Sequence, residues 1–310
     1  MQISPLILAT RKSALALQQT NWVKSELERR IPGAQVRLLT LGTTGDRLRH
    51  QPLPQIGGKG LFTQELEEAL LDGRARLAVH SLKDLPTELR PELTIASVPV
   101  REDPRDALIS RTGKPFAELP QGARIGTSSV RRAAQLRRLR PDVRIEPLRG
   151  NLDTRLRKLR QGPLDAIVLA AAGLHRMDWR DRITEYFPEH VLVPAVGQGA
   201  LGIQTRADDR SALEAAEVLE DSWARISTTA ERALLRHLGG GCQIPIAGYA
   251  AREASKFVLH AVVLHPDGSE MIQVKEFAST VSIEAAEELG KLTAMNLLQQ
   301  GGRRLLAIPS

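Results

Sequence analysis

Residues 6–30, LILATRKSALALQQTNWVKSELERR, decide the fold because they place an apolar strand directly before an amphipathic helix. The run LILAT predicts a buried strand, and the apolar periodicity after it predicts a helix over residues 14–30. A diverged copy of this pattern stands at residues 123–140, ARIGTSSVRRAAQLRRLR. The sequence therefore predicts two related halves, each opened by a strand and a helix.

Each half continues in the same way. A proline-containing turn after the first helix leads to a second strand, at 36–41 in one half and 143–148 in the other. A second helix and a third strand follow, the strands being LAVHS at 77–81 and DAIVLA at 165–170. Strands that alternate with helices predict parallel sheets with right-handed crossovers. The predicted fold class is α/β, with two tandem doubly wound domains around a cleft.

From about residue 218 the pattern changes to that of a small α+β domain. A helix over 221–238 precedes two strand-like stretches, the second of which turns at Pro266–Gly268, and a final helix is expected near Ser282. The stretch PAVGQGALGIQTR, at 194–206, is expected to return the chain to the first domain. The predicted domains are 1–99 with 200–217, 100–199, and 218–310.

The composition is that of a soluble globular protein. The chain has 310 residues, of which 42% are hydrophobic and 25% charged, and it has no apolar run of 18 residues. Its N-terminus lacks the basic region of a signal peptide, and its single cysteine cannot form an intramolecular disulfide. We therefore expect a cytoplasmic protein with no membrane partner.

The positive charge is mostly arginine. The formal net charge is +7, and 34 arginines stand against 9 lysines. The planar guanidinium fork of arginine suits paired hydrogen bonds to carboxylate or phosphate. Aromatic residues make up only 3% of the chain, and no helix-turn-helix or zinc-finger spacing occurs, which disfavours a nucleic-acid partner.

Cationic and hydroxylic residues follow the predicted strands. Ligands of open α/β sheets bind beyond the carboxyl ends of the strands, and free backbone N–H groups at helix starts favour anions. We therefore expect a polyanion site in the cleft between the halves. The residues at these strand ends are Thr10, Arg11, Ser13, Ser81, Lys83, Asp84, Thr127, Ser129, Arg131, Arg132 and Arg149.

Two glycine-rich stretches do not fit phosphate or dinucleotide motifs. GQGALG at 197–202 matches G-x-G-x-x-G, but a short strand and a turn are expected after it instead of a helix. GGKG at 57–60 lacks the first glycine and the Ser/Thr of a phosphate loop. It belongs to an insert at 46–60 that is either a mobile lid, with Lys59 reaching an anion, or an inert surface excursion.

Cys242 follows three consecutive glycines, which place it on a flexible loop and argue against simple burial. No second thiol and no spaced histidines accompany it, so no metal site is expected. His237 lies five residues upstream, but helix geometry gives it no reason to face Cys242.

The stretch AVHSLKDLPT, residues 78–87, carries an acidic group in a region crowded with positive charge. Asp84 either forms a simple ion pair with Lys83 or acts in catalysis. In the second case its carboxylate would stabilise a cation that develops on a bound substrate, while arginines hold the acid groups of that substrate.

Taken together, these residues resemble the porphobilinogen deaminase family, also called hydroxymethylbilane synthases. The resemblance runs from about residue 6 to beyond 270, and its motifs stand in one order. They are ATRKSALAL, GGKGLFTQELEEALL, AVHSLKDLPT, REDPRDALIS, GTSSVRRAAQL, LRGNLDTRL, DAIVLAAAGLHR, PAVGQGALGI and GGGCQIPIAGYA.

The resemblance implies three domains, two of them like the lobes of a periplasmic binding protein. It also implies a monomeric transferase that joins four porphobilinogen molecules head to tail, releases ammonia and yields the linear hydroxymethylbilane. In this family a dipyrromethane cofactor, built from the substrate, is attached through a thioether to the cysteine of the glycine loop, here Cys242. The carboxylates of the pyrroles would be the polyanion expected in the cleft.

The resemblance further implies roles for individual residues. Asp84 is expected to be catalytic, at the pyrrole nitrogens. The residues expected to bind the cofactor are Ser81, Lys83, Thr127, Ser129, Arg131, Arg132 and Arg155. Those expected to bind the incoming substrate are Arg11, Ser13, Gln19, Lys59, Phe62, Arg149 and Arg176.

Two other interpretations fit the residues less well. A non-catalytic, two-lobed anion-binding protein would leave Asp84 and the loop cysteine unexplained, and a basic nucleic-acid-binding protein would leave the arginines at the strand ends unexplained.

Overall fold

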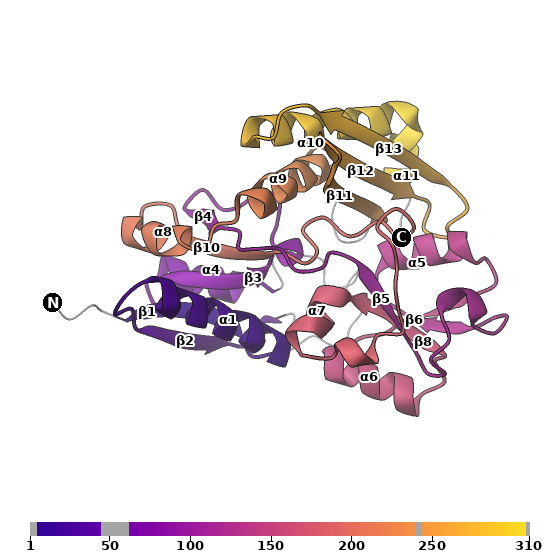
Figure 1. The fold of residues 1–310 in the computed structure, drawn as a ribbon, viewed down its shortest axis with the longest axis horizontal. Helices are drawn as coiled ribbons and strands as arrows, with labels where there is room; N and C mark the ends of the chain where they lie inside the picture. Colours follow the sequence, from indigo (N-terminus) through magenta and orange to yellow (C-terminus); the bar gives the residue numbers. More distant parts are fainter. Residues whose placement is uncertain (1–4, 45–61, 240–243, 308–310) are drawn as a thin grey trace. The chain divides into compact units, whose positions relative to one another are not determined.

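The computed structural model describes residues 5–44, 62–239 and 244–307. The chain forms two compact units, one of Met1–Glu102 with Ala200–Arg225 and the other of Asp103–Gly199 with Ile226–Ser310 (Figure 1). The sequence-based division into three domains stays a prediction. The insert at 46–60 lies outside the described residues, so both interpretations of it remain open.

The first unit contains a five-stranded sheet of order β2-β1-β3-β10-β4. Its strands are β1 (Leu6–Arg11), β2 (Val36–Leu41), β3 (Leu77–Ser81), β4 (Leu93–Ser97) and β10 (Leu201–Arg206). Strand β1 is parallel to β2 and β3, whereas β10 is antiparallel to β3 and β4. The return of the chain through 194–206 is thus confirmed, because β10 completes this sheet.

Helices cover both faces of the first sheet. They are α1 (Ala14–Arg30), α4 (Gln64–Leu71) and α8 (Arg210–Glu217). Leu8 of β1 packs in one core with Leu27 of α1 and Ala212 of α8. The next residue, Ala9, packs in another core with Leu70 of α4. This alternation follows from the two-residue period of a strand and explains why the strand LILAT is apolar on both faces.

The second unit repeats the arrangement in a sheet of order β7-β6-β8-β5-β9. Its strands are β5 (Asp106–Ser110), β6 (Arg124–Gly126), β7 (Arg144–Glu146), β8 (Ala166–Ala170) and β9 (Glu185–Tyr186). Strand β6 is parallel to β7 and β8, and β5 is antiparallel to β8 and β9. The helices are α5 (Val130–Leu139), α6 (Leu152–Gln161) and α7 (Ala171–Arg176).

The predicted α/β class is confirmed, but both sheets are mixed, whereas the strand–helix alternation predicted parallel ones. In each sheet three parallel strands come from the βαβ repeat, and the antiparallel strand comes from outside it. Strand β5 opens the second half before its repeat, and β10 enters the first sheet only after the second half is complete. The periodicity within one half carries no information about these two strands.

The C-terminal residues form a three-stranded antiparallel sheet of β11 (Ile246–Glu253), β12 (Lys256–Leu264) and β13 (Met271–Ala278). Helices α9 (Ser222–His237) and α10 (Ile283–Leu297) belong to the same part of the chain, and a short helix α11 (Arg303–Leu306) follows. Gly290 of α10 allows a close approach to α9, since a Cβ there would lie 2.4 Å from the carbonyl oxygen of Ala230.

The turn between β12 and β13 packs against α5. Arg137 donates through Nη1 to the carbonyl oxygen of Pro266 at 2.9 Å. Gly268 has a φ of +82°, and a Cβ there would lie 2.6 Å from the carbonyl oxygen of Ala134. Only glycine fits this approach, so the C-terminal sheet is tied to the helix that carries Arg131 and Arg132.

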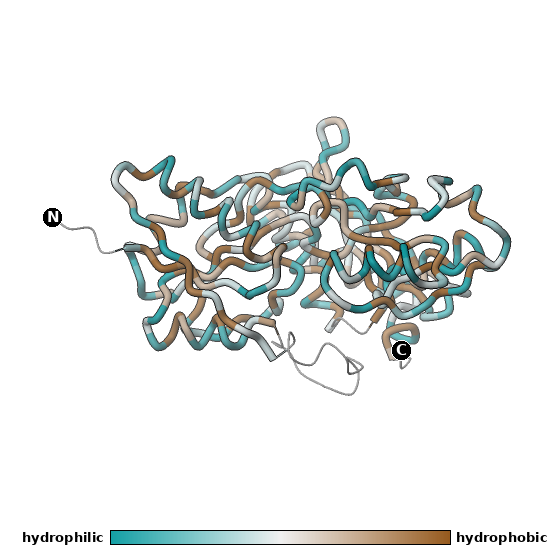
Figure 2. The backbone as a smooth tube through the Cα atoms, turned by 90° about the horizontal axis from the view of Figure 1, so that it is seen from below, coloured by the Kyte–Doolittle hydropathy of each residue, from teal (hydrophilic) through white to brown (hydrophobic). Residues whose placement is uncertain are grey.

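Hydrophobic and hydrophilic residues alternate in short stretches along the chain (Figure 2). Within the described ranges, no helix has the length and apolar character needed to cross a membrane.

Candidate functional site

The N-terminus of α5 in the second unit gathers four of the residues predicted to bind the cofactor. Ser129 caps the helix by accepting a hydrogen bond from the backbone N–H of Arg132 at 3.4 Å. Thr127, at the end of β6, accepts from the backbone N–H of Ser129 at 3.2 Å. The helix therefore begins where the sequence predicted an anion site, and Arg131 and Arg132 lie in its first turn.

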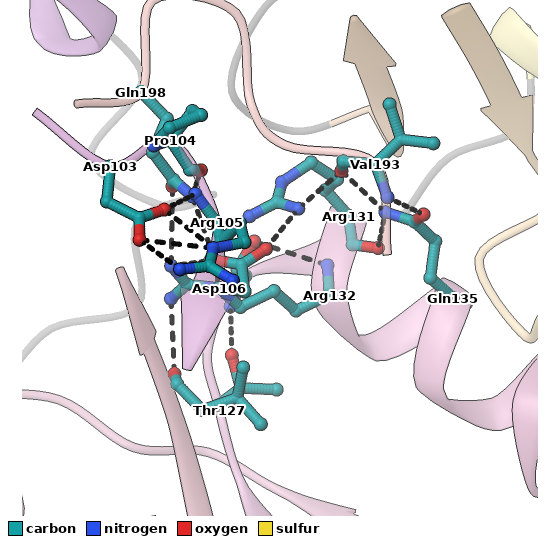
Figure 3. Close-up of polar contacts among 12 residues, drawn as sticks. Asp103, Pro104, Arg105, Asp106, Thr127, Arg131, Arg132, Gln135, Val193 and Gln198 are labelled. Carbon is teal, nitrogen blue, oxygen red and sulfur yellow. Dashed lines mark hydrogen bonds and ion pairs between the residues drawn. The ribbon is translucent and has the colours of Figure 1, made fainter. Parts of the chain in front are cut away.

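Arg131 and Arg132 are both buried and converge on one carboxylate, that of Asp106 (Figure 3). Arg131 donates through Nη1 to Oδ2 at 2.7 Å, and Arg132 donates through Nε to Oδ1 at 2.8 Å. Asp106 has no exposed surface. Burial alone would raise its pKa, but the charges of the two arginines hold the pKa of Asp106 well below its usual range.

Sequence reasoning missed Asp106. It stands at the first position of the buried strand DALIS, and a fully buried aspartate almost always has a charged or hydrogen-bonding partner. That position was the available signal. Gln198 also contacts Asp106, donating through Nε2 to Oδ1 at 3.0 Å and to the carbonyl oxygen of Pro104 at 2.7 Å.

Three further predicted arginines lie in the second unit, at the starts and ends of its helices. Arg149 follows β7, and Arg155 of α6 donates through Nε to the carbonyl oxygen of Gly150 at 2.8 Å. Gly150 has a φ of +116°, which favours glycine at the turn into α6. Arg176, the last residue of α7, donates through Nη2 to the carbonyl oxygen of Gly199 at 2.7 Å.

In the first unit, predicted substrate residues follow β1, and predicted cofactor residues follow β3, its neighbour in the sheet. Ser13 caps α1 by accepting from the backbone N–H of Ala16 at 3.3 Å. Gln19 is buried in α1 and donates through Nε2 to Oγ of Ser81 at 3.1 Å. This bond links the start of α1 to the end of β3.

Arg11 and Phe62 also lie together in the first unit. The Cζ atom of Arg11 is 4.3 Å from the centroid of the Phe62 ring, within the range of a cation–π contact. Phe62 stands just before α4. Lys59 lies outside the described residues, so its predicted contact with an anion stays a prediction.

Lys83 and Asp84 lie in a single 3-10 turn, η1 (Leu82–Asp84), directly after β3. Both side chains are exposed, whereas Leu82 and Leu85 on either side are buried and pack in one core. The two leucines therefore anchor the turn, and the charged pair between them is held at the surface of this unit.

His80 is the buried neighbour of this turn. It lies in β3, and burial lowers the pKa of its imidazole to about 4, with the charge of Arg11 acting in the same direction. Gly202 of β10 pairs with His80, and Gln204 lies two residues further along β10, on the same face of the sheet. Gln204 donates through Nε2 to Oε1 of Glu67 at 3.1 Å. The sheet next to this turn thus contains buried polar side chains, and its histidine is neutral at physiological pH.

The site residues divide between the units. Arg11, Ser13, Gln19, Phe62, Ser81, Lys83 and Asp84 belong to the first, and Thr127, Ser129, Arg131, Arg132, Arg149, Arg155 and Arg176 to the second. Their meeting in one cleft stays a prediction.

Cys242 lies outside the described residues. His237 donates through Nδ1 to the carbonyl oxygen of Ala233 in its own helix. In the described part of the chain, no group of three His, Cys, Asp or Glu side chains is arranged to hold a metal ion.

Comparison with known proteins covers nearly the whole chain. Residues 6–214 match the family model described as "Porphobilinogen deaminase, dipyromethane cofactor binding domain", and residues 226–299 match "Porphobilinogen deaminase, C-terminal domain". The porphobilinogen deaminase of Syntrophobacter fumaroxidans is 48% identical over 299 residues, which is 96% of both chains. That of Roseiflexus sp. is 49% identical over 302 residues, 97% of this chain and 98% of the relative.

Solved structures with a related arrangement are much more distant in sequence. A lipoprotein of the YaeC family from Enterococcus faecalis is 12% identical, with a TM-score of 0.42, over 72% of this chain and 94% of the other. A probable amino-acid ABC transporter extracellular-binding protein from Bacillus subtilis is also 12% identical, with a TM-score of 0.42, over 70% of this chain and 90% of the other.

Proposed function

The chain belongs to the porphobilinogen deaminase family, and we propose how its own residues divide the work of that reaction. Its activity is that of a porphobilinogen deaminase with a dipyrromethane cofactor. The observation that carries this conclusion is the identity of 48% with a relative of that name over 96% of both chains. Both family models match, the one for the cofactor-binding domain and the one for the C-terminal domain.

The residues at the start of α5 suit the acid groups of a dipyrromethane. Two guanidinium groups and one buried carboxylate give this cluster a net charge of +2 − 1 = +1, and the helix N-terminus adds positive potential. Ser129 and Thr127 lie beside them. Each hydroxyl oxygen accepts from a backbone N–H group, and a hydroxyl that accepts in this way can still donate its proton to a carboxylate. We assign the cofactor carboxylates to these four residues together with Ser81, Lys83 and Arg155.

Cys242 is assigned as the attachment point. It is the only thiol of the chain, so no other residue can form a thioether to the cofactor. When bound, the dipyrromethane supplies a free α-carbon to which the first substrate unit is joined. Family membership implies four additions of porphobilinogen and release of the linear hydroxymethylbilane.

Asp84 is assigned as the catalytic group. Positive charge develops on the pyrrole nitrogen of a porphobilinogen molecule as its ammonia leaves, and a carboxylate near that nitrogen lowers the energy of this state. The exposed position of Asp84 on an anchored turn supports the role, since the carboxylate is accessible to a ligand and its backbone is fixed.

The incoming substrate is assigned to a separate set of residues, namely Arg11, Ser13, Gln19, Lys59, Phe62, Arg149 and Arg176. Arginine forks can bind the acetate and propionate groups of porphobilinogen in a bidentate manner. By holding these groups, the residues fix the position of the reacting carbon. They take no part in bond making themselves. A monomeric enzyme that works in the cytoplasm on this small molecule completes the proposal.

Two measurements on the purified protein test this proposal. The intact mass should exceed the mass of the chain by two pyrrole units, and added porphobilinogen should be consumed with release of ammonia. A non-catalytic anion-binding protein would show neither. A normal increment on a Cys242→Ala variant would contradict the attachment site and leave the activity assignment intact.

A further inference from the structure

We propose that Asp106 is a positioning residue for the cofactor, and that it acts through Arg131 and Arg132. The proposal rests on the assignment of these two arginines to cofactor carboxylates. It adds a residue that lies within the motif REDPRDALIS but had no role assigned to it. It also gives a reason why two adjacent arginines in one helical turn can both serve one ligand.

Adjacent residues of a helix point in directions about 100° apart, so Arg131 and Arg132 do not share a target by default. Asp106 makes them converge. Its Oδ2 accepts from Arg131 at 2.7 Å, and its Oδ1 accepts from Nε of Arg132 at 2.8 Å and lies 2.6 Å from Nη2 (Figure 3). Both oxygens of one carboxylate thus fix both guanidinium planes.

The two arginines differ in how many of their guanidinium nitrogens have hydrogen-bond partners within the protein. All three nitrogens of Arg132 are engaged, by Asp106, by the carbonyl oxygen of Val168 at 3.2 Å and by Oε1 of Gln198 at 3.4 Å. In Arg131, Nη1 is engaged by Asp106 and by the carbonyl oxygen of Val193, both at 2.7 Å. Within the described ranges, Nε and Nη2 of Arg131 have no protein partner, and this edge of the guanidinium matches a carboxylate in a bidentate geometry.

The charge balance points the same way. Without Asp106, two buried cations would lie at the positive end of a helix, an arrangement that is costly in the absence of an anion. With Asp106, one positive charge remains for a ligand. The carboxylate therefore lowers the electrostatic cost of burying two arginines before the cofactor binds, and it holds the two side chains in one arrangement.

The backbone around the cluster is held as well. Gln135 accepts through Oε1 from the backbone N–H of Val193 at 2.7 Å and donates through Nε2 to its carbonyl oxygen at 3.1 Å. This clamp fixes the carbonyl group that Arg131 uses. The cluster is thus a preorganised set of donors, which lowers the ordering that ligand binding has to supply.

The test uses full-length protein made in cells that cannot synthesise porphobilinogen, so that the chain carries no cofactor. Porphobilinogen is then added, and the mass increment is followed with time. A purely structural role would lower the amplitude, which is the fraction of molecules that can react. A positioning role lowers the rate constant of the molecules that are folded.

Asp106→Asn removes the charge, and Asp106→Glu keeps it but moves the carboxylate by one methylene group. We expect both rate constants to fall by about tenfold or more, the scale of losing hydrogen bonds to charged groups. Asp209→Asn is the matched control, since Asp209 is largely buried and its Oδ2 accepts from Nε of Arg76 at 2.9 Å in the other unit. This control should acquire the cofactor at the wild-type rate constant.

Gln198→Met keeps the test decisive if the Asp106 variants do not fold. It removes the hydrogen bond that Gln198 donates to Asp106 and the one that it accepts from Arg132, while every charge stays in place. The rate constant of cofactor acquisition should fall several-fold. The inference is overturned if a folded Asp106 variant, or Gln198→Met when neither of them folds, matches the rate constant of the control. Wild-type protein that gains no increment would instead contradict the proposed function.

Discussion

The start of α5 and the turn η1 hold charged site residues in opposite ways. At α5, Arg131 and Arg132 are buried and bonded to a buried aspartate. At η1, Lys83 and Asp84 are exposed, and only the flanking leucines are buried. A group that must hold a ligand through many turnovers gains from a fixed, water-poor network, whereas a group that meets successive substrates must remain accessible.

The largest effect is expected for Cys242→Ala, which should abolish both the covalent cofactor and turnover. The chain has no other cysteine, so no alternative thioether can form. Intact mass and porphobilinogen consumption measure the two effects, and circular dichroism checks that the variant folds. Residual turnover with a normal mass increment would show that attachment occurs elsewhere.

Asp84→Asn should lower kcat by about 10²–10³ or more, the loss typical of removing one preorganised electrostatic group. Because Asp84 is exposed, the thermal unfolding midpoint should stay close to that of the wild type. The same substitution at the buried Asp106 should clearly lower the midpoint, because it leaves two buried arginines uncompensated. Equal changes in stability at the two sites would remove the contrast.

Acid should destabilise the first unit through His80 of β3. Its pKa is about 4 in the folded protein, below the 6.5 of an ordinary histidine, so between these values only the unfolded chain binds the proton. Stability is therefore lost as pH falls through this window, by up to about 3 kcal/mol. Chemical denaturation at several pH values measures it.

His80→Asn should flatten this pH dependence, even if the variant is less stable at every pH. The matched control is His190→Gln at an exposed histidine, which should leave the slope unchanged. A variant with the wild-type slope would assign the acid sensitivity to other groups.

Arg149→Ala should reduce kcat/KM about 10- to 150-fold, corresponding to loss of about 1.5–3 kcal/mol for hydrogen bonds to a charged group. Its side chain is only partly buried, so the effect on folding should be smaller than the effect on substrate use. Steady-state kinetics on protein with confirmed cofactor mass measures it. An unchanged kcat/KM would show that Arg149 takes no part in substrate binding.

The local features of the fold were predictable because they depend on neighbouring residues. The helix over 14–30 and its cap Ser13 follow from periodicity and from a side chain that can accept a backbone hydrogen bond. Ser129 caps α5 for the same reason. The predicted turn at Pro266–Gly268 is found between β12 and β13, where Gly268 has a positive φ.

The features that were missed depend on residues distant in sequence. The return of residues 194–206 to the first domain was predicted, but the antiparallel pairing of β10 with β3, about 120 residues earlier in the chain, was not, because no periodicity encodes it. The partners of Asp106 lie 25, 26 and 92 positions away in the chain. Its place in an apolar strand indicated that Asp106 has a charged or hydrogen-bonding partner, but only the fold identifies Arg131 and Arg132 as that partner. The predicted arginines were found from strand ends, and their buried counter-ion was not.

The most direct test of the contrast is single-turnover ammonia release from Asp84→Asn whose cofactor has been verified by intact mass. If the buried cluster holds the cofactor and the exposed turn performs the chemistry, the variant should carry the full mass increment. It should then release ammonia at least about 10²-fold more slowly than the wild type. A full increment with release at the wild-type rate would contradict the account, because it would leave Asp84 with no part in the step where positive charge develops.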